Sequence, residues 1–218
     1  MTSRIDIHLH TSRYSPDSNI TPEQMIIDAK AAGLTSLAIT EHDTLWPLDE
    51  LAELNARPDA KGLVILGGVE VSAREGHFLC FGLKSLKNIE PGILLKYLVS
   101  EVQAQNGAIV AAHPFRWDQD FHSILDEHGP IFQALELASK NVEPECRAQV
   151  ENVLRQHPKL MATGSSDAHQ PGQIGCYFTE FDAPVTTIVE LIEALKSGRG
   201  VARHHPNNPV WQPSGPIL

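Results

Sequence analysis

The feature that most constrains the fold of this chain is a regular alternation of short apolar runs with segments of helical periodicity. Thr21, Pro22 and Gln24 form a capping box with proline at the first helical position. Gly33 follows as a stop signal. Strands that alternate with helices pack as a mainly parallel sheet with helices on its faces, so the sequence predicts an α/β fold. The expected strands are residues 4–9, 36–40, 63–69, 78–82, 108–112, 134–137 and 160–164, and the expected helices begin near residues 22, 48, 91, 144 and 188.

The length of 218 residues corresponds to one domain, which we place at residues 1–198, followed by a Pro- and Asn-rich tail over residues 199–218. A content of 42% hydrophobic and 20% charged residues is typical of a globular protein with its own core. No apolar run reaches the ~18–20 residues that span a bilayer, and the N-terminus lacks the apolar segment of a secretory signal. We therefore expect a cytoplasmic protein without a membrane partner, and its oligomeric state stays open.

The charge of the chain limits its partners. Lys and Arg number 17 against 27 Asp and Glu, which gives a net charge of −10, and no basic block is present. Binding to long nucleic acid or to an anionic membrane is therefore not expected. The cysteines Cys80, Cys146 and Cys176 lie far apart and match no metal or redox spacing. Histidine, with 11 copies, is the unusual residue type, and it is the commonest metal ligand near neutral pH.

Polar side chains with metal-binding chemistry follow five of the expected strands, at the point where each strand ends. The carboxyl ends of the strands of a parallel α/β barrel meet on one face, where active sites are built. The sequence therefore predicts that these side chains share one site. They are His8 and His10 after the first strand, Glu41, His42 and Asp43 after the second, Glu70 after the third, His113 after the fifth, and Asp167 and His169 after the last.

The spacing of His8 and His10 supports a metal site. Alternation along a strand places the two imidazoles on one face, roughly 6–7 Å apart. Two imidazoles at this spacing can converge on one ion. Asp6 lies on the same face and is a candidate for orienting one of them.

Five segments of the chain resemble, in order, the motifs of the PHP (polymerase and histidinol phosphatase) superfamily. The segments are Ile5 to Thr11 with Tyr14 to Asp17, Ile39 to Asp43, Gly67 to Ser72 with His77 downstream, Ala112 to Pro114, and Gly164 to His169. The second motif more often has Asp where this chain has Glu41. The resemblance covers residues 4 to 175 and implies a distorted (β/α)7 TIM-like barrel with a site for up to three divalent metal ions at the C-terminal ends of its strands.

The resemblance also implies the ligands of each metal. Mixed nitrogen and oxygen ligands suit Zn, Mn or Fe, or a mixture of them, better than Mg or Ca. Three divalent ions on six neutral imidazoles and three carboxylates leave the site at about +3, so an acidic chain can still attract an anionic substrate. Carried over by position, one metal is held by His8, His10, Asp167 and the bridging Glu70, a second by Glu70, His77 and His113, and a third by Asp17, His42 and His169.

The activity implied by the resemblance is that of a stand-alone phosphoesterase for a small phosphorylated metabolite or nucleotide. Metal coordination lowers the pKa of water towards ~7, so a hydroxide shared by two metals is the expected nucleophile. Glu70, Asp167 and His113 are expected to carry catalysis as ligands of the metals that activate this water. Arg116, three residues after His113, is the candidate for binding the substrate phosphate, and its alternative is a solvent-exposed loop arginine. Arg13, Arg74 and Lys140 also lie in expected rim loops and are secondary candidates.

Three alternatives to this function stay open. Histidinol phosphatase activity is neither supported nor excluded by the residues. A C–N metallohydrolase also begins with His-x-His, but no lysine ends an expected barrel strand. A non-catalytic metal-binding accessory domain is the third alternative, although all nine ligand positions are filled. The short segment between His77 and His113 leaves no room for the cap domain of several small-molecule phosphoesterases, so the site is expected to be open.

Overall fold

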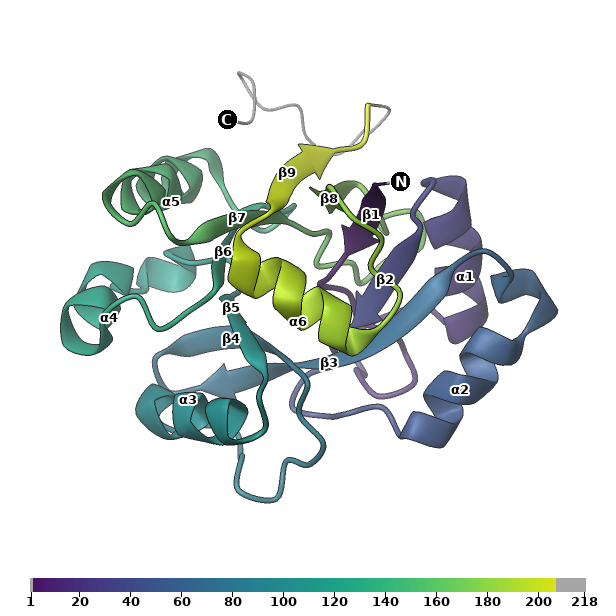
Figure 1. The fold of residues 1–218 in the computed structure, drawn as a ribbon, viewed down its shortest axis with the longest axis horizontal. Helices are drawn as coiled ribbons and strands as arrows, with labels where there is room; N and C mark the ends of the chain where they lie inside the picture. Colours follow the sequence, from purple (N-terminus) through teal and green to yellow (C-terminus); the bar gives the residue numbers. More distant parts are fainter. Residues whose placement is uncertain (1, 207–218) are drawn as a thin grey trace.

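The strands form one sheet with the order β7-β6-β5-β4-β3-β2-β1-β8-β9 in a computed structural model that describes residues 2–206 (Figure 1). The helices lie around this sheet. The strands are β1 (Ser3–Asp6), β2 (Ser36–Ile39), β3 (Val64–Ala73), β4 (Gly76–Phe81), β5 (Ala108–Ala111), β6 (Ala134–Ala138), β7 (Met161–Gly164), β8 (Tyr177–Phe181) and β9 (Gly200–His204). The helices are α1 (Pro22–Ala31), α2 (Leu48–Ala56), α3 (Leu95–Ala104), α4 (Phe121–His128), α5 (Pro144–Gln156) and α6 (Ile188–Ser197), with short 3₁₀ turns at Pro58–Ala60 and Arg116–Asp118.

The sheet curls into a nearly closed barrel. Strands β4 and β8 pair antiparallel with their neighbours, and the other strands all run in one direction. At the seam, β7 lies against β8 and β9. The Thr179 hydroxyl of β8 donates to the Gly164 carbonyl of β7 at 2.9 Å and accepts from the Gly164 N–H at 3.0 Å. The expected α/β class with a TIM-like barrel is confirmed.

Three details of the sequence-based prediction were wrong. Strand β4 is antiparallel, because only two residues join it to β3 and a parallel crossover needs a dozen or more. The segments Tyr177–Phe181 and Gly200–His204 are strands that we did not predict, so the expected tail does not begin at residue 199; residues 207–218 lie outside the described part of the chain. Helix α3 begins at Leu95 rather than near Pro91.

The three largest apolar clusters of the described residues hold the barrel together. The inner cluster joins Ile5 and Ile7 of the β1 segment to Phe81, and α6 covers it with Leu191 and Leu195. A second cluster packs α3, α4 and α5 on the outer face of β3 to β6, and a third packs α1 and α2 against β2 and β3. All five of the named side chains are at most 1% exposed. The burial of these clusters provides the main hydrophobic stabilisation of the fold.

Helix α6 closes the end of the barrel at which the parallel strands begin. Its Lys196 ammonium donates to the carbonyl of Asn106, just before β5, and the hydroxyl of Ser36 at the start of β2 donates to Val185, just before α6. Figure 1 shows α6 lying across the centre of the sheet. The opposite end, where the parallel strands finish, is left for a site. Among the described residues, no helix has the length and apolar character needed to cross a membrane.

Candidate metal centre

The open end of the barrel collects the nine residues that the sequence singled out as metal ligands. They come from the loops after β1, β2, β5 and β7 and from the paired strands β3 and β4. Five are buried, and Asp17 is the most exposed, with a side-chain exposure of 55%. The residues are His8, His10, Asp17, His42, Glu70, His77, His113, Asp167 and His169.

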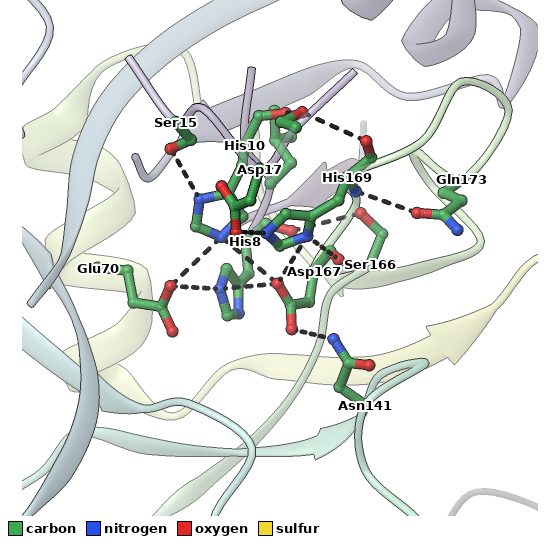
Figure 2. A network of polar contacts seen from close by, with 12 residues as sticks. His8, His10, Ser15, Asp17, Glu70, Asn141, Ser166, Asp167, His169 and Gln173 are labelled. Carbon is green, nitrogen blue, oxygen red and sulfur yellow. Dashed lines mark hydrogen bonds and ion pairs between the residues drawn. The ribbon is translucent and has the colours of Figure 1, made fainter. Parts of the chain in front are cut away.

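Two carboxylates hold the centre of this cluster. Figure 2 shows Glu70 and Asp167 on either side of the rings of His8 and His10. The His8 Nε2 atom lies 3.5 Å from Glu70 Oε2 and 3.4 Å from Asp167 Oδ1. The His10 Nε2 atom lies 3.3 Å and 3.4 Å from the same two oxygens. The two rings have centroids 5.2 Å apart, and both Nε2 atoms face the same two carboxylate oxygens.

The second oxygen of Glu70 faces a different pair of imidazoles. Glu70 Oε1 lies 3.0 Å from His77 Nδ1 and 3.2 Å from His113 Nε2. The β3–β4 hairpin places His77 beside Ser72, two residues along from Glu70, which brings the side chain of His77 back over the carboxylate. Glu70 therefore has the geometry of a bridge between two groups of ligands, and both groups satisfy the distance requirement for a shared ion.

A third group forms at the edge of the cluster. The Asp17 Oδ2 atom lies 3.2 Å from the Nε2 atoms of both His42 and His169, and these two nitrogens are 3.4 Å apart. The His10 ring stacks on both, with centroid distances of 4.1 Å to His42 and 4.3 Å to His169. His42 also reaches the centre, since its Nδ1 atom lies 2.8 Å from Glu70 Oε2. The three groups form one continuous cluster.

Glu136 and Asp6 support the cluster from behind. The fully buried Glu136 carboxylate lies 3.1 Å from His8 Nδ1 and accepts the His113 backbone N–H at 2.8 Å. The sequence suggested Asp6 as a residue that orients an imidazole ring, and the structure does not place it in that role. Its carboxylate accepts backbone N–H groups of Ser166 and Gly175 at 2.9 and 2.8 Å, and burial raises its pKa to about 6.

Glu41 takes no part in the histidine cluster, although it precedes His42 in the second motif. Its buried carboxylate accepts hydrogen bonds from the hydroxyls of Thr11 and Ser15, both at 2.5 Å, and from the indole N–H of Trp46 at 2.8 Å. These bonds fix the loop that follows β1. Ser15 in turn lies 3.4 Å from His10 Nδ1, so Glu41 positions a candidate ligand indirectly.

The electrostatics of the cluster favour positive charge at its centre. Burial disfavours the carboxylate forms of Glu70 and Asp167, but the surrounding histidines outweigh burial and hold the pKa of both carboxyls well below the usual range. Burial likewise opposes the charged form of His8, yet Asp167 and Glu70 raise its pKa well above the ordinary value. For His10, burial dominates and lowers the pKa to about 4.

Three buried atoms indicate what the cluster lacks. The Nε2 atoms of His8 and His10 and the Oε2 atom of Glu70 make no hydrogen bond of acceptable geometry within the described chain. A buried polar atom without a partner costs about 1–3 kcal/mol. These three atoms face one another across 3.3 to 3.5 Å, and imidazole nitrogen with carboxylate oxygen is a donor set for divalent transition metals. The residues therefore fit a bound metal ion.

Backbone strain concentrates at the same end of the barrel. Among the described residues, the non-glycine positions with positive φ include Asp43, His113 and Asp167, with φ of 49°, 28° and 49°. Each lies in the loop that follows a strand and carries a candidate ligand. Such conformations cost of the order of 1–3 kcal/mol each and cluster at functional sites.

Four residues at the rim complete the site, and only two of them were considered from the sequence. Arg116 lies 3.8 Å from Asp167 Oδ2 through its Nη1 atom, and Lys140 lines the hollow above the cluster. Asn141 donates to Asp167 Oδ2, and Trp117 also lines the hollow. Asn141 follows β6 as the predicted ligands follow their strands, so the same signal could have found it. Arg13, which we had considered with lower weight, pairs with Glu50 away from the cluster.

Comparisons with known proteins agree with this description. A family model described as PHP-associated matches residues 153–199. A 3',5'-nucleoside bisphosphate phosphatase of Chromobacterium violaceum is 42% identical over 74 residues, which is 34% of this chain and 24% of that protein. The chain spans between 24% and 68% of the length of the curated relatives it matches.

Solved structures show the same fold. A two-domain protein from Bacteroides vulgatus, described as containing a predicted PHP-like metal-dependent phosphoesterase, superposes with a TM-score of 0.73 at 22% identity and covers 94% of this chain and 65% of its own. A lesion-specific endonuclease from Pyrococcus furiosus superposes with a TM-score of 0.70 at 22% identity over 90% of this chain and 56% of its own. At these identities, the likeness establishes the barrel.

Proposed function

We propose that the chain is a metal-dependent phosphoesterase of the PHP superfamily that hydrolyses a small phosphorylated metabolite or nucleotide. The observation that carries the proposal is the environment of Glu70. Five imidazoles lie within 3.5 Å of one buried carboxylate, from His8, His10, His42, His77 and His113. This arrangement has no use in a core but suits a carboxylate that bridges metal ions.

The proposed ligand sets are those given by the motifs. His8, His10 and Asp167 hold the first metal with Glu70, and Glu70 bridges to a second metal held by His77 and His113. Asp17, His42 and His169 hold the third. The ions are Zn, Mn or Fe, and when bound they supply an activated water and positive charge for the phosphate oxygens.

The other residues prepare the site for this chemistry. Glu136 holds the His8 ring so that Nε2 faces the cluster, and the Asn141 amide holds Asp167 in the same way. Arg116 and Lys140 line the hollow above the cluster, where their charges attract a phosphate group. Catalysis rests on Glu70, Asp167 and His113 as ligands, and we assign no general acid for the leaving group.

The proposed substrate is small rather than a long nucleic acid. The net charge of −10 repels a polyanion over most of the molecular surface, while the positive charge of a loaded site acts only at short range. An endonuclease shares the fold, so short oligonucleotides belong among the substrates to be tested.

The proposal is tested by phosphate release after reconstitution with Mn or Zn. The panel contains sugar phosphates, nucleoside monophosphates and bisphosphates, histidinol phosphate, short oligonucleotides, and an aryl diester with its monoester. Release from a narrow subset is expected. No release from any member, with metal shown to be bound, would favour the accessory-domain or C–N hydrolase alternatives.

Glu70→Gln tests the bridging role directly. The amide keeps the shape of the side chain but removes one negative charge and one acceptor oxygen, so metal binding and phosphate release should both fall by at least a hundredfold. Glu180→Gln, on β8, where the carboxylate pairs with the half-exposed side chains of Arg4 and Arg203, is the matched control and should retain both. Full turnover by Glu70→Gln would contradict the proposed site.

A further inference from the structure

We propose that Trp117 is a stacking platform for the nucleobase of a nucleotide whose phosphate enters the metal centre; this inference rests on the proposed phosphoesterase function and narrows its substrate class. Trp117 is the residue at the rim that the metal chemistry leaves unexplained. It is 66% exposed, although it is among the largest apolar side chains of the protein. Its ring lies 5.4 Å from the rings of both His77 and His113, which places it next to the cluster.

Trp117 and Arg116 stand between two hollows. The inner hollow, of about 340 Å³, lies over the cluster and is lined by Asp167 and Lys140 among others. The outer hollow, of about 280 Å³, extends along the β3–β4 turn and is lined by Arg74. Both include His77, His113, Arg116 and Trp117 in their walls. Since sites for small molecules span about 300–1,000 Å³, the two hollows together suit a ligand with a phosphate at one end and a second group at the other.

The loop that carries Trp117 is held firmly while the ring is left open. Phe115 is buried and contacts the rings of Phe121 and His122 at 5.0 to 5.5 Å. The Gln119 amide accepts from the Phe115 N–H at 3.2 Å and donates to the Glu75 carbonyl at 2.5 Å, which ties the loop to the β3–β4 turn. Both Phe115 and Trp117 have left-handed backbones, with φ of 68° and 56°. The exposure of Trp117 is therefore built into an anchored loop.

The chemistry of the platform selects a planar aromatic group. The Arg116 guanidinium carbon lies 4.2 Å from the Trp117 ring centre, so one cation holds the ring in place and remains close to Asp167 in the inner hollow. A phosphate near Arg116 would leave the attached sugar and base beside the ring. Every nucleobase can stack on tryptophan, because every base has an aromatic face, whereas a sugar phosphate has no aromatic face.

Calorimetric binding to the Mn-loaded protein tests this inference. The probes are the phosphonate analogues of adenosine 5'-monophosphate, adenosine 3'-monophosphate and ribose 5-phosphate, which a phosphoesterase cannot hydrolyse. We expect at least one adenosine analogue to bind roughly tenfold or more tightly than the ribose analogue. Trp117→Ala should remove this preference, and Trp117→Phe, which keeps a stacking face, should retain most of it.

Tyr97→Ala is the matched control. Tyr97 is 56% exposed and has Lys96 over its ring at 5.0 Å, but it lies on α3 and lines neither hollow. Tyr97→Ala should leave the preference for the adenosine analogues unchanged. Equal affinity of the wild-type protein for all three probes, or a preference that survives Trp117→Ala, would overturn the inference.

The same measurements separate this inference from the proposed function. If the preference is present and depends on Trp117 but the substrate panel releases no phosphate, the platform stands and the phosphoesterase proposal falls. If phosphate is released and the preference for the adenosine analogues is absent, the phosphoesterase proposal stands and the stacking role of Trp117 falls. A further titration with the phosphonate analogue of a trinucleotide distinguishes a free nucleotide from the end of a strand, and tighter binding of the trinucleotide would assign the platform to strand ends.

Discussion

At the residue scale, Glu136 is the clearest case of a side chain that acts through another. It is fully buried, one oxygen faces His8 Nδ1 and the other accepts the His113 N–H. Glu136→Gln would turn an amide nitrogen towards one of two groups that need an acceptor. We expect the affinity for Mn to fall by roughly 10- to 100-fold while the circular dichroism spectrum stays unchanged.

The measurement for Glu136→Gln is a titration with Mn in competition with a chelating dye. Glu143→Gln, an acidic residue directly before α5, provides the same change of charge on the surface. Rescue by Glu136→Asp is not expected, because the shorter side chain cannot reach both His8 and the His113 backbone. An unchanged Mn affinity for Glu136→Gln would show that the His8 ring is positioned without this carboxylate.

At the scale of single residues, only part of the candidate site could be predicted from the sequence. The rim position of the candidate ligands was predictable, because strand ends share one face of a parallel barrel. The partners of these ligands were not. Asp6 and Glu136 are both buried carboxylates near the ends of strands. Asp6 accepts backbone N–H groups, whereas Glu136 also faces the His8 imidazole. Which partner each carboxylate takes depends on its rotamer and on residues up to 169 positions away in the sequence.

At the scale of elements, α6 offers a test of how far the site depends on the opposite end of the barrel. Thr187 accepts from the Glu190 N–H at 3.2 Å, and Glu190 accepts from the Thr187 N–H at 3.0 Å, which completes a capping box. Thr187→Ala should cost about 1 kcal/mol and lower the melting temperature by roughly 2–4 °C. Phosphate release below the transition should stay unchanged, because α6 closes the end away from the metal centre.

Thermal unfolding followed by circular dichroism measures the effect, with Thr187→Ser as the variant that keeps the cap. A large loss of phosphate release by Thr187→Ala at 25 °C would contradict the separation of the two ends. The capping box itself was visible in the sequence, since Thr187 and Glu190 stand three residues apart before an apolar stripe.

Strands were harder to predict than helices, for physical reasons that differ between them. The Gly200–His204 segment has Ala202 as its one buried residue, so no apolar run marks it, and its strand conformation depends on pairing with β8. The direction of β4 is set by the short Arg74–Glu75 connection rather than by the pattern of the strand. These strands depend on tertiary pairing, which a local pattern does not contain.

At the scale of the whole molecule, the candidate metal centre joins segments from both halves of the chain. Glu70 and Asp167 lie far apart in sequence but share the imidazoles of His8 and His10. A cation that binds this arrangement binds only the folded chain, because the unfolded chain does not assemble the ligands. Metal binding should therefore stabilise the whole barrel against unfolding.

The size of this stabilisation follows from linkage. At a free metal concentration a hundred times the dissociation constant, the gain is about 2.7 kcal/mol. For a chain of this length, that gain corresponds to a rise in melting temperature of roughly 5–10 °C. Treatment with a chelator should lower the melting temperature by this amount, and addition of Mn or Zn should restore it. Asp167→Asn, which removes one of the two central carboxylates, should lose most of the metal-dependent shift, whereas Asp126→Asn on the exposed face of α4 should keep it. The same melting temperature with chelator and with saturating Mn would mean that the candidate ligands do not bind the metal. Any metal that binds only the folded chain must raise its stability.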